Sequence, residues 1–354
     1  MSFQNACLYF VFIKNKKMKA IGFRKSLPIS DKDSFIMFEA DQPSPSGYDL
    51  LVKVAAVSVN PVDFKVRQSA AKENTLEDPK IIGYDAVGEV VAVGDKVSLF
   101  KEGDEVYYAG DLTRSGSNAA YQLIDERIVG AKPKSLSIPE AAALPLTGLT
   151  AWESIFDRMK VDPNTAEGKS ILVLAGAGGV GSIAIQIAKQ IAGLTVIATA
   201  SREETENWCK SMGADFVVNH HELKSGLEKI GHKEVDYILD CVDINGYWET
   251  VIDIIKPQGH IVTISGSSEA LNLMLLKNKS VSFSWEFMFT RSMYTTDDII
   301  RQHEILNEIA DLVDKGVLKS TLKTELKGFS VENFKKAHEM QESGKSIGKT
   351  VITF

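Results

Sequence analysis

Cysteine is scarce in this sequence of 354 residues, which contains three: Cys7, Cys209 and Cys241. No CxxC pair is present, and an odd number of widely separated cysteines forms no even disulfide framework. Such usage is typical of a reducing compartment, so we predict a cytoplasmic protein. The same scarcity leaves few thiolates for a metal site.

Long apolar runs are also absent. The run Ala6–Ile13 has 8 residues, far fewer than the roughly 20 that span a bilayer. Its positive charges, Lys14, Lys16 and Lys17, follow the run, whereas those of a secretory signal precede it. We therefore predict neither a membrane span nor a signal peptide, and we interpret residues 1–17 as an N-terminal extension.

The sequence has no block of basic residues. It contains 40 Lys and Arg against 47 Asp and Glu, a net charge of −7. Because phosphate neutralisation supplies most of the affinity for duplex nucleic acid, this composition argues against such a partner. Apolar residues make up 44% and charged residues 25%, as in globular proteins. Since one compact core rarely exceeds about 250–300 residues, the length predicts two domains.

Two kinds of sequence follow one another along the chain. Residues 19–140 contain short β-branched segments between glycine-rich turns, which predicts a barrel-like or sandwich domain. From about Leu144, short apolar runs alternate with helical stretches, as in a parallel sheet buried on both faces. We therefore predict an α/β fold with a doubly wound parallel sheet. Its expected strands are Ser170–Ala175, Thr195–Ala200, Phe216–Asn219, Tyr237–Cys241 and His260–Ser265, with Ser280–Met288 as a candidate edge strand.

A glycine-rich loop gives the strongest functional signal. Gly176, Gly178 and Gly181 match the pattern GxGxxG between the first expected strand and a predicted helix, Val180–Ile191. In such a βαβ unit the glycines allow a tight turn, the approach of a pyrophosphate and close helix packing. The helix N-terminus offers free N–H groups to the phosphates. The sequence therefore predicts a dinucleotide site.

The end of the second strand distinguishes the two nicotinamide cofactors. An NAD site usually has an acidic residue there, bonded to the ribose 2′-hydroxyl. This chain has Ser201 and Arg202, and a guanidinium pairs well with a 2′-phosphate. Glu203 and Glu204 are the main objection, but we expect them to begin the next helix, where acids are favoured. We predict NADPH rather than NADH.

With these features the chain resembles the medium-chain dehydrogenase/reductase superfamily, particularly its quinone oxidoreductase branch and the bacterial zinc-type alcohol dehydrogenase-like proteins. The resemblance covers Met18 to Phe354. It implies a GroES-like catalytic domain made of residues 18–145 and 291–354, and an inserted Rossmann NADP-binding domain, residues 146–290. It also implies a homodimer, for which Ser280–Met288 is the candidate edge. The motifs in family order are Val59–Asp63, Gly83–Gly88, Gly103–Val106, Leu144–Ala151, the glycine loop and Gly348–Lys349.

The resemblance places the catalytic zinc ligands of related enzymes at Asn60, Tyr84 and Ala143, none of which is a good zinc ligand. Asp85 would supply at most one ligand, and no group of four cysteines follows Gly103–Val106. We therefore predict no metal. Without a Lewis acid, hydride transfer to a quinone or to an activated enone is favoured, because these acceptors delocalise the developing charge.

Three residues are the candidate catalytic groups. The Asn60 amide is expected to orient the nicotinamide or the acceptor carbonyl, or else only caps the Asn-Pro turn. The Tyr84 hydroxyl is a candidate donor to the developing oxyanion, with packing as an equal alternative. Lys65 is a candidate proton donor or a solvated lysine. Phe287 and Phe289 line an acceptor pocket or belong to the core.

The predicted cofactor contacts come from the glycine loop, from the carboxyl ends of the strands and from the family motifs. Thr147 is expected at the nicotinamide end, and Asn219 with His220 near the adenosine. The complete set is Thr147, Gly176, Gly178, Gly179, Val180, Gly181, Ser201, Arg202, Asn219, His220, Val242, Ser265 and Lys349.

The sequence thus predicts a zinc-independent, NADPH-dependent reductase for a small quinone or enone. One alternative is a zinc-dependent alcohol dehydrogenase with unusual ligands. Another is a relative that binds NADPH without turnover or binds single-stranded RNA, although RNA binding needs a basic groove that the net charge does not support.

Overall fold

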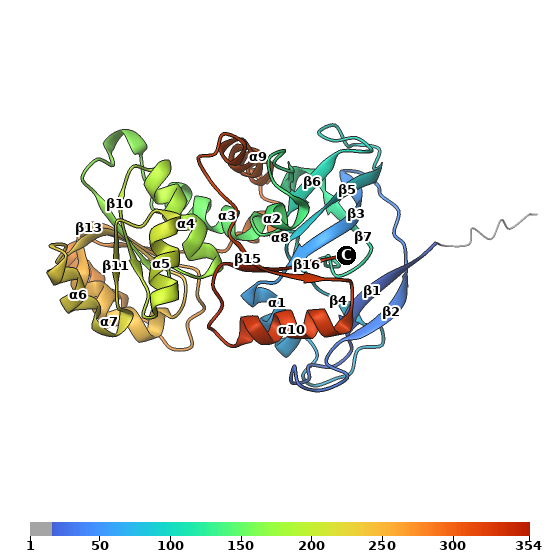
Figure 1. The fold of residues 1–354 in the computed structure, drawn as a ribbon, viewed down its shortest axis with the longest axis horizontal. Helices are drawn as coiled ribbons and strands as arrows, with labels where there is room; N and C mark the ends of the chain where they lie inside the picture. The colour runs from blue at the N-terminus through green and yellow to red at the C-terminus, as the bar shows by residue number, and fades with distance from the viewer. Residues whose placement is uncertain (1–15) are drawn as a thin grey trace, which may run out of the picture.

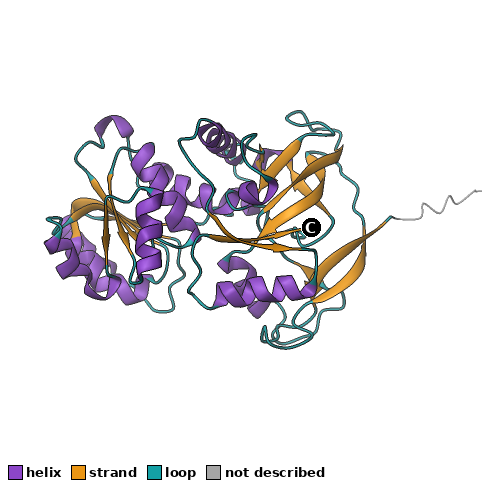
Figure 2. Ribbon diagram, viewed as in Figure 1, coloured by secondary structure: helices purple, strands orange, loops and turns teal. Residues whose placement is uncertain are grey.

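The computed structural model describes residues 16–354 (Figure 1). Strand β1 begins at Lys17, one residue before the predicted start, and residues 1–15 of the predicted extension lie outside the described part. Figure 2 shows two parts of the molecule. On the left a sheet is surrounded by helices, and on the right lies a part that is rich in strands. Within residues 16–354, no helix is long and apolar enough to cross a membrane.

The first sheet is parallel and has the order β11-β10-β9-β12-β13-β14. Its central strands are largely buried, as the sequence predicted for a sheet covered on both faces: all five residues of β9 are buried. Its strands are β9 (Ser170–Leu174), β10 (Thr195–Thr199), β11 (Phe216–Val218), β12 (Val235–Asp240), β13 (Ile255–Thr263) and β14 (Ser282–Trp285). The helices between them are α4 (Gly179–Gln190), α5 (Glu203–Met212), α6 (Leu223–Lys229) and α7 (Ile244–Ile254).

The second sheet combines both ends of the chain. Its order is β15-β16-β3-β5-β6-β8, with β7 also paired to β3. The C-terminal strand β16 runs antiparallel to β3, with Val351 opposite Ser58, which places the last residues beside the Asn60 turn. The strands are β3 (Asp49–Ser58), β5 (Ala86–Val93), β6 (Glu105–Tyr108), β7 (Tyr121–Asp125), β8 (Val129–Ala131), β15 (Leu322–Lys327) and β16 (Lys349–Thr353).

Smaller elements complete the molecule. Strands β1 (Lys17–Phe23), β2 (Ile36–Asp41) and β4 (Lys80–Ile81) form a third sheet. The remaining α-helices are α1 (Pro61–Ser69), α2 (Ile138–Ala142), α3 (Pro145–Trp152), α8 (Thr290–Tyr294), α9 (Arg301–Asp314) and α10 (Val331–Glu342). A π-helical segment, Glu153–Arg158, continues α3. The α/β fold is therefore confirmed, while the boundaries at 145/146 and 290/291 stay predictions.

Strand β14 is the outer strand of the parallel sheet and, among the strands of residues 16–354, pairs with β13 alone. It is shorter than the predicted segment, because the chain leaves the sheet after Trp285 and enters α8. Large apolar side chains remain exposed on and near this edge: Leu273, Met274, Leu275 and Trp285.

Candidate active site

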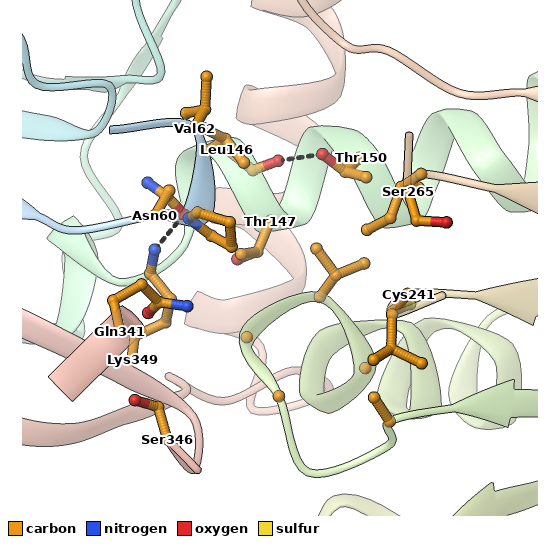
Figure 3. A pocket seen from close by; sticks show the side chains of 18 of the residues that line it. Asn60, Val62, Leu146, Thr147, Thr150, Cys241, Ser265, Gln341, Ser346 and Lys349 are labelled. Atoms are coloured by element: carbon orange, nitrogen blue, oxygen red, sulfur yellow. Dashed lines mark hydrogen bonds between the residues drawn. The ribbon is translucent and has the colours of Figure 1, made fainter. Parts of the chain in front are cut away.

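A cavity of about 450 Å³ lies where the two larger sheets meet. Its walls come from the glycine loop, the Asn60 turn, α3, the ends of β12 and β13, and the segment before β16 (Figure 3). Carboxyl ends of parallel strands are where open α/β sheets bind ligands. Ten predicted residues line it: Asn60, Lys65, Thr147, Gly178, Gly179, Val180, Gly181, Val242, Ser265 and Lys349.

The glycine loop has the shape that a dinucleotide needs. A Cβ at Gly181 would lie 2.5 Å from the carbonyl oxygen of Ala175, so only glycine lets α4 begin so close to β9. Gly178 caps the helix in an extended conformation, and the first N–H groups of α4 remain free of partners within the helix. These groups, at the cavity wall, fit a pyrophosphate.

The tight turn of the loop is at Ala175. The glycine pattern had predicted it at Gly176. Ala175 has a φ of 58°, in the left-handed region, and its N–H donates to Thr199 Oγ1 (2.9 Å). Gly176 is not in that region and does not line the cavity. It is small because a Cβ there would lie 2.7 Å from the Cβ of Ala198 and 3.1 Å from Cys209 Sγ.

Lys349 begins β16 and reaches into the cavity from the catalytic part of the chain. A Cβ at Gly179 would lie 2.9 Å from Lys349 Cδ, so the lysine stem packs on the glycine loop. Its Nζ donates to Val59 O (3.1 Å), to Asp85 Oδ2 (3.1 Å) and to Asn60 Oδ1. An ammonium has three N–H groups, so none remains for a phosphate. The predicted cofactor contact is thus confined to the stem.

Asn60 precedes α1, and its amide is fully used inside the protein. Its Nδ2 donates to Tyr84 O (2.9 Å) and Asp85 Oδ2 (2.8 Å), while its Oδ1 accepts from Lys349. Its backbone N–H donates to Asp63 Oδ2 (2.7 Å), which caps α1. The expectation that this amide orients nicotinamide or the acceptor carbonyl is therefore not supported by the geometry. Asn60 instead organises the buried polar groups below the cavity.

The carboxyl groups of this cluster are shielded from water, since Asp63 and Asp85 are each 1% exposed. Burial raises the pKa of Asp63 to about 7, against the lowering effects of its hydrogen bond from Asn60 and of the Lys349 charge. Burial also raises the pKa of Asp85 and lowers that of Lys349, while their mutual attraction opposes both changes. Asp85 Oδ1 accepts from Leu146 N (2.7 Å), which links the cluster to α3.

Tyr84 does not occupy the predicted position. Its side chain is fully buried, does not line the cavity and packs edge-on against Phe289, with ring centroids 5.6 Å apart. Its hydroxyl has no hydrogen-bond partner among the described residues. Burial raises the pKa of this hydroxyl above its ordinary value. Tyr84 is therefore a packing residue, which was the alternative expectation for it. Lys65 is exposed and lines the cavity.

Apolar side chains form one wall of the cavity. Phe287 and Phe289 both line it; Phe287 is 46% exposed, whereas Phe289 is 2% exposed and also belongs to the hydrophobic core. That this wall holds an acceptor stays a prediction. Thr147 and Thr150 project from α3 on the same side (Figure 3). Their hydroxyls donate within the helix, Thr150 to Leu146 O at 2.8 Å and Thr147 to Leu144 O at 3.2 Å.

The ends of β12 and β13 form the opposite wall. The buried Asp240 carboxylate accepts from Ser265 Oγ (2.7 Å) and from the backbone N–H of Val242 (3.1 Å), which fixes both predicted residues. Cys241, between Asp240 and Val242 in the sequence, is partly exposed and lines the cavity. Burial raises the pKa of its thiol well above the ordinary value.

The residues predicted for the adenosine end lie outside the cavity. Ser201 and Arg202 are exposed after β10, and Arg202 Nη2 donates to Lys345 O (3.0 Å). Glu203 begins α5, as expected for the acids that follow. Asn219 Oδ1 accepts from the N–H of His221 (3.0 Å), and the rings of His220 and His221 have centroids 4.0 Å apart.

Three buried acids beside the cavity were not predicted as site residues: Asp63, Asp85 and Glu286. Asp63 and Asp85 lie inside the motifs Val59–Asp63 and Gly83–Gly88, which was the available signal, and Asp85 was considered only as a zinc ligand. Glu286 is 2% exposed and its Oε2 accepts from Arg158 Nε (2.8 Å). Burial and the neighbouring Glu153 raise the pKa of Glu286 to about 9. No local sequence pattern marks it, because its partners come from the π-helical segment.

The groups at the implied zinc positions do not fit zinc. Zinc takes thiolate, imidazole or carboxylate ligands, whereas these positions hold an amide at Asn60, a buried phenol at Tyr84 and a methyl group at Ala143. The Asp85 carboxylate is already engaged by the Lys349 ammonium at 3.1 Å. Within residues 16–354, no three His, Cys, Asp or Glu side chains are grouped to hold a metal ion.

Comparison with known proteins agrees with this architecture. The family described as zinc-binding dehydrogenase matches residues 212–352, and the alcohol dehydrogenase GroES-like domain matches residues 46–146. A zinc-type alcohol dehydrogenase-like protein of Staphylococcus epidermidis is 46% identical over 338 residues, 95% of this chain and 99% of that protein. A 2-methylene-furan-3-one reductase of Solanum lycopersicum is 34% identical over 312 residues, 86% of this chain and 71% of that protein.

The solved structure of Escherichia coli quinone oxidoreductase in complex with NADPH is also similar. It has a TM-score of 0.78 and 26% sequence identity, and the match covers 95% of this chain and 100% of that one. A glycine loop, a GroES-like sheet closed by the C-terminal strand, and relatives that match over nearly the whole length all lead to one family. The chain belongs to the medium-chain dehydrogenase/reductase superfamily and is an oxidoreductase of that family.

Proposed function

We propose that this protein is a zinc-independent, NADPH-dependent reductase of quinones or α,β-unsaturated carbonyl compounds. The observation that carries the proposal is the cation at the bottom of the cavity. It is the Lys349 ammonium, bound to the Asp85 carboxylate and the Asn60 amide. The oxygen atoms that would bind a metal ion are therefore occupied by a group of the chain itself.

The chemistry of the acceptor follows from the donors that the cavity offers. The Asn60 amide and the hydroxyls of Thr147 and Thr150 all have partners within the protein. A saturated ketone needs strong donors for the alkoxide that forms on reduction. A quinone or an enone spreads the incoming charge over a conjugated system, so this cavity suits it better. Two relatives, named as a quinone oxidoreductase and a 2-methylene-furan-3-one reductase, support this acceptor class.

The chain's own residues perform three tasks in this reaction. When bound, the dihydronicotinamide supplies a hydride, which adds to the β-carbon of an enone or to a quinone. Thr147, Val180 and Ser265, which line the cavity, would hold the nicotinamide end, and Phe287 with Phe289 would form an apolar wall that excludes water from the acceptor. The enolate or hydroquinone anion then takes a proton. The exposed Lys65 at the cavity wall is our candidate donor.

The choice of NADPH rests on the end of β10. No acidic side chain stands at Ser201 or Arg202, and the Arg202 guanidinium is held beside the strand by Lys345 O. Glu204 is engaged by Lys323 at 3.2 Å. A guanidinium favours a 2′-phosphate, and the structure of the Escherichia coli relative is a complex with NADPH.

The decisive experiment is a panel of quinones, enones, saturated ketones and alcohols, assayed by NADPH absorbance with NADH in parallel and zinc content measured on the same sample. We expect turnover of quinones or enones with NADPH in protein that contains no zinc. One tightly bound zinc per chain together with alcohol oxidation would establish the zinc-dependent alternative. Tight NADPH binding without turnover of any acceptor would establish the non-catalytic alternative.

We also propose a homodimer in the cytoplasm. The β14 edge has one free side, and the exposed Leu273, Met274 and Trp285 beside it would be covered by a second copy. The scarcity of cysteine supports a reducing compartment. Light scattering that gives the mass of a single chain at micromolar concentration would refute the dimer.

A further inference from the structure

Three oxygen atoms, two from the Asn60 turn and one from Asp85, converge on one nitrogen below the cavity. Val59 O, Asn60 Oδ1 and Asp85 Oδ2 all accept hydrogen bonds from Lys349 Nζ (Figure 3 shows the bond to Asn60). Asn60, Asp85 and Lys349 are each at most 3% exposed. A carbonyl, an amide and a carboxylate oxygen form a donor set for a cation, and here the cation is a side chain.

The backbone fixes the ammonium from both sides. Before Lys349, the N–H of Gly348 donates to Ala177 O of the glycine loop (2.9 Å). After it, Thr350 O accepts from the N–H of Val59 (3.1 Å). The lysine stem lies between them against Gly179. One residue therefore contacts the glycine loop through its stem and the Asn60 turn through its head.

We propose that Lys349 is a positioning residue that takes the place of a catalytic metal ion. Its ammonium holds the Asn60 turn and Asp85 while its stem packs on the glycine loop, so the residue sets the nicotinamide end against the acceptor wall. This inference rests on the proposed reductase function for its kinetic readout. The stability and metal readouts below are independent of that function.

Lys349 has two roles that can be separated by experiment: it neutralises Asp85 and it positions the site. Methionine keeps an unbranched stem of similar length, so Lys349→Met preserves much of the packing on Gly179 and removes the ammonium. It leaves the buried Asp85 carboxylate without its counter-ion. The double variant Lys349→Met/Asp85→Asn removes both charges, so it repairs the charge defect but not the missing link to Asn60 Oδ1.

The experiment compares the wild type, Lys349→Met and Lys349→Met/Asp85→Asn. Lys327→Met serves as the matched control, because Lys327 is exposed on the neighbouring strand β15. Thermal unfolding, zinc content, the dissociation constant for NADPH and kcat with a soluble quinone are measured for each. Lys349→Met should unfold at a lower temperature, and the double variant should recover most of that loss.

The two roles predict different kinetics for the double variant. If Lys349 positions the site, kcat falls at least tenfold in both variants, while the dissociation constant for NADPH changes less than threefold because the stem contact remains. Recovery of kcat together with stability in the double variant would overturn the proposal, as would a kcat within threefold of the wild type in Lys349→Met. Stoichiometric zinc in the wild type would also overturn it. If the wild type reduces no acceptor, the reductase function fails separately, and the stability and zinc results still decide whether Lys349 holds the place of a metal.

Discussion

The titration of Asp63 gives the sharpest quantitative prediction. Burial raises the pKa of this carboxyl from its ordinary value of 3.8 to about 7. Asp63 Oδ2 accepts from the N–H of Asn60, whereas Oδ1 is buried without a partner. Keeping an ionised carboxylate in this position costs roughly 4 kcal/mol at a pH above both values, since each pKa unit corresponds to about 1.4 kcal/mol.

The sign follows from proton binding in the two states. Between about pH 4 and pH 7 the folded protein holds a proton on Asp63 that the unfolded chain has lost. The contribution of Asp63 to the free energy of unfolding therefore falls as the pH rises through this window, and it is constant above about pH 7. Asp63→Asn removes the titration and keeps an acceptor oxygen for the N–H of Asn60.

The assay is urea denaturation of the wild type and Asp63→Asn at several pH values between 5 and 8.5. Circular dichroism suits it better than fluorescence, because all four tryptophans lie between residues 152 and 285, away from α1. We expect Asp63→Asn to be more stable than the wild type by roughly 1.5 kcal/mol at pH 5, and by roughly 4 kcal/mol at pH 8.5. A difference between the two proteins that does not change with pH would refute the reasoning.

Three other substitutions have defined outcomes. Arg202→Gln should raise the dissociation constant for NADPH at least tenfold and leave that for NADH nearly unchanged; equal effects on both cofactors in fluorescence titrations would contradict the 2′-phosphate assignment. Gly181→Ala should abolish NADPH binding and lower the unfolding temperature, because its Cβ would lie 2.5 Å from Ala175 O; wild-type binding in the same titration would show that the loop adapts. Arg291→Met removes the partner of the buried Glu153, 2.9 Å away, and should destabilise the protein by roughly 3–5 kcal/mol; a loss below about 1 kcal/mol in urea denaturation would mean that Glu153 is protonated in the native state.

The parts of the fold that sequence predicted are those set by backbone periodicity. The apolar runs from Ser170 to Ser265 became five parallel strands, and the glycine pattern located the start of α4, because both signals are local. The antiparallel contact of β16 with β3 joins residues almost 300 positions apart, so no window of sequence reveals it. Only the resemblance to a family indicated that the tail returns to the first domain.

The roles of the side chains in the site were predicted less well. The reason is that their polar atoms bond to one another instead of to a ligand. Motif position correctly brought Asn60 and Lys349 to the cavity, but it assigned them to external ligands. Their polar atoms are satisfied by each other and by Asp85, and a buried polar group seldom remains unpaired. The geometry does not support Tyr84 as a donor to the oxyanion either. The motif located this residue beside the site, but its ring packs against Phe289.

The saturation of these groups has a consequence for selectivity. Removing one donor from an oxyanion site typically lowers a rate by about 10²–10³-fold, and this cavity presents no buried donor without an internal partner among Asn60, Thr147, Thr150 and Lys349. Reduction of a saturated carbonyl compound would be slowed by the full factor, because its developing charge stays on one oxygen. Reduction of a conjugated acceptor would be slowed much less, because the charge spreads away from that oxygen as the hydride arrives. If the protein is the reductase we propose, its site would therefore discriminate between acceptors by offering little stabilisation of the oxyanion, and the acceptor's own electronic structure would decide whether it reacts.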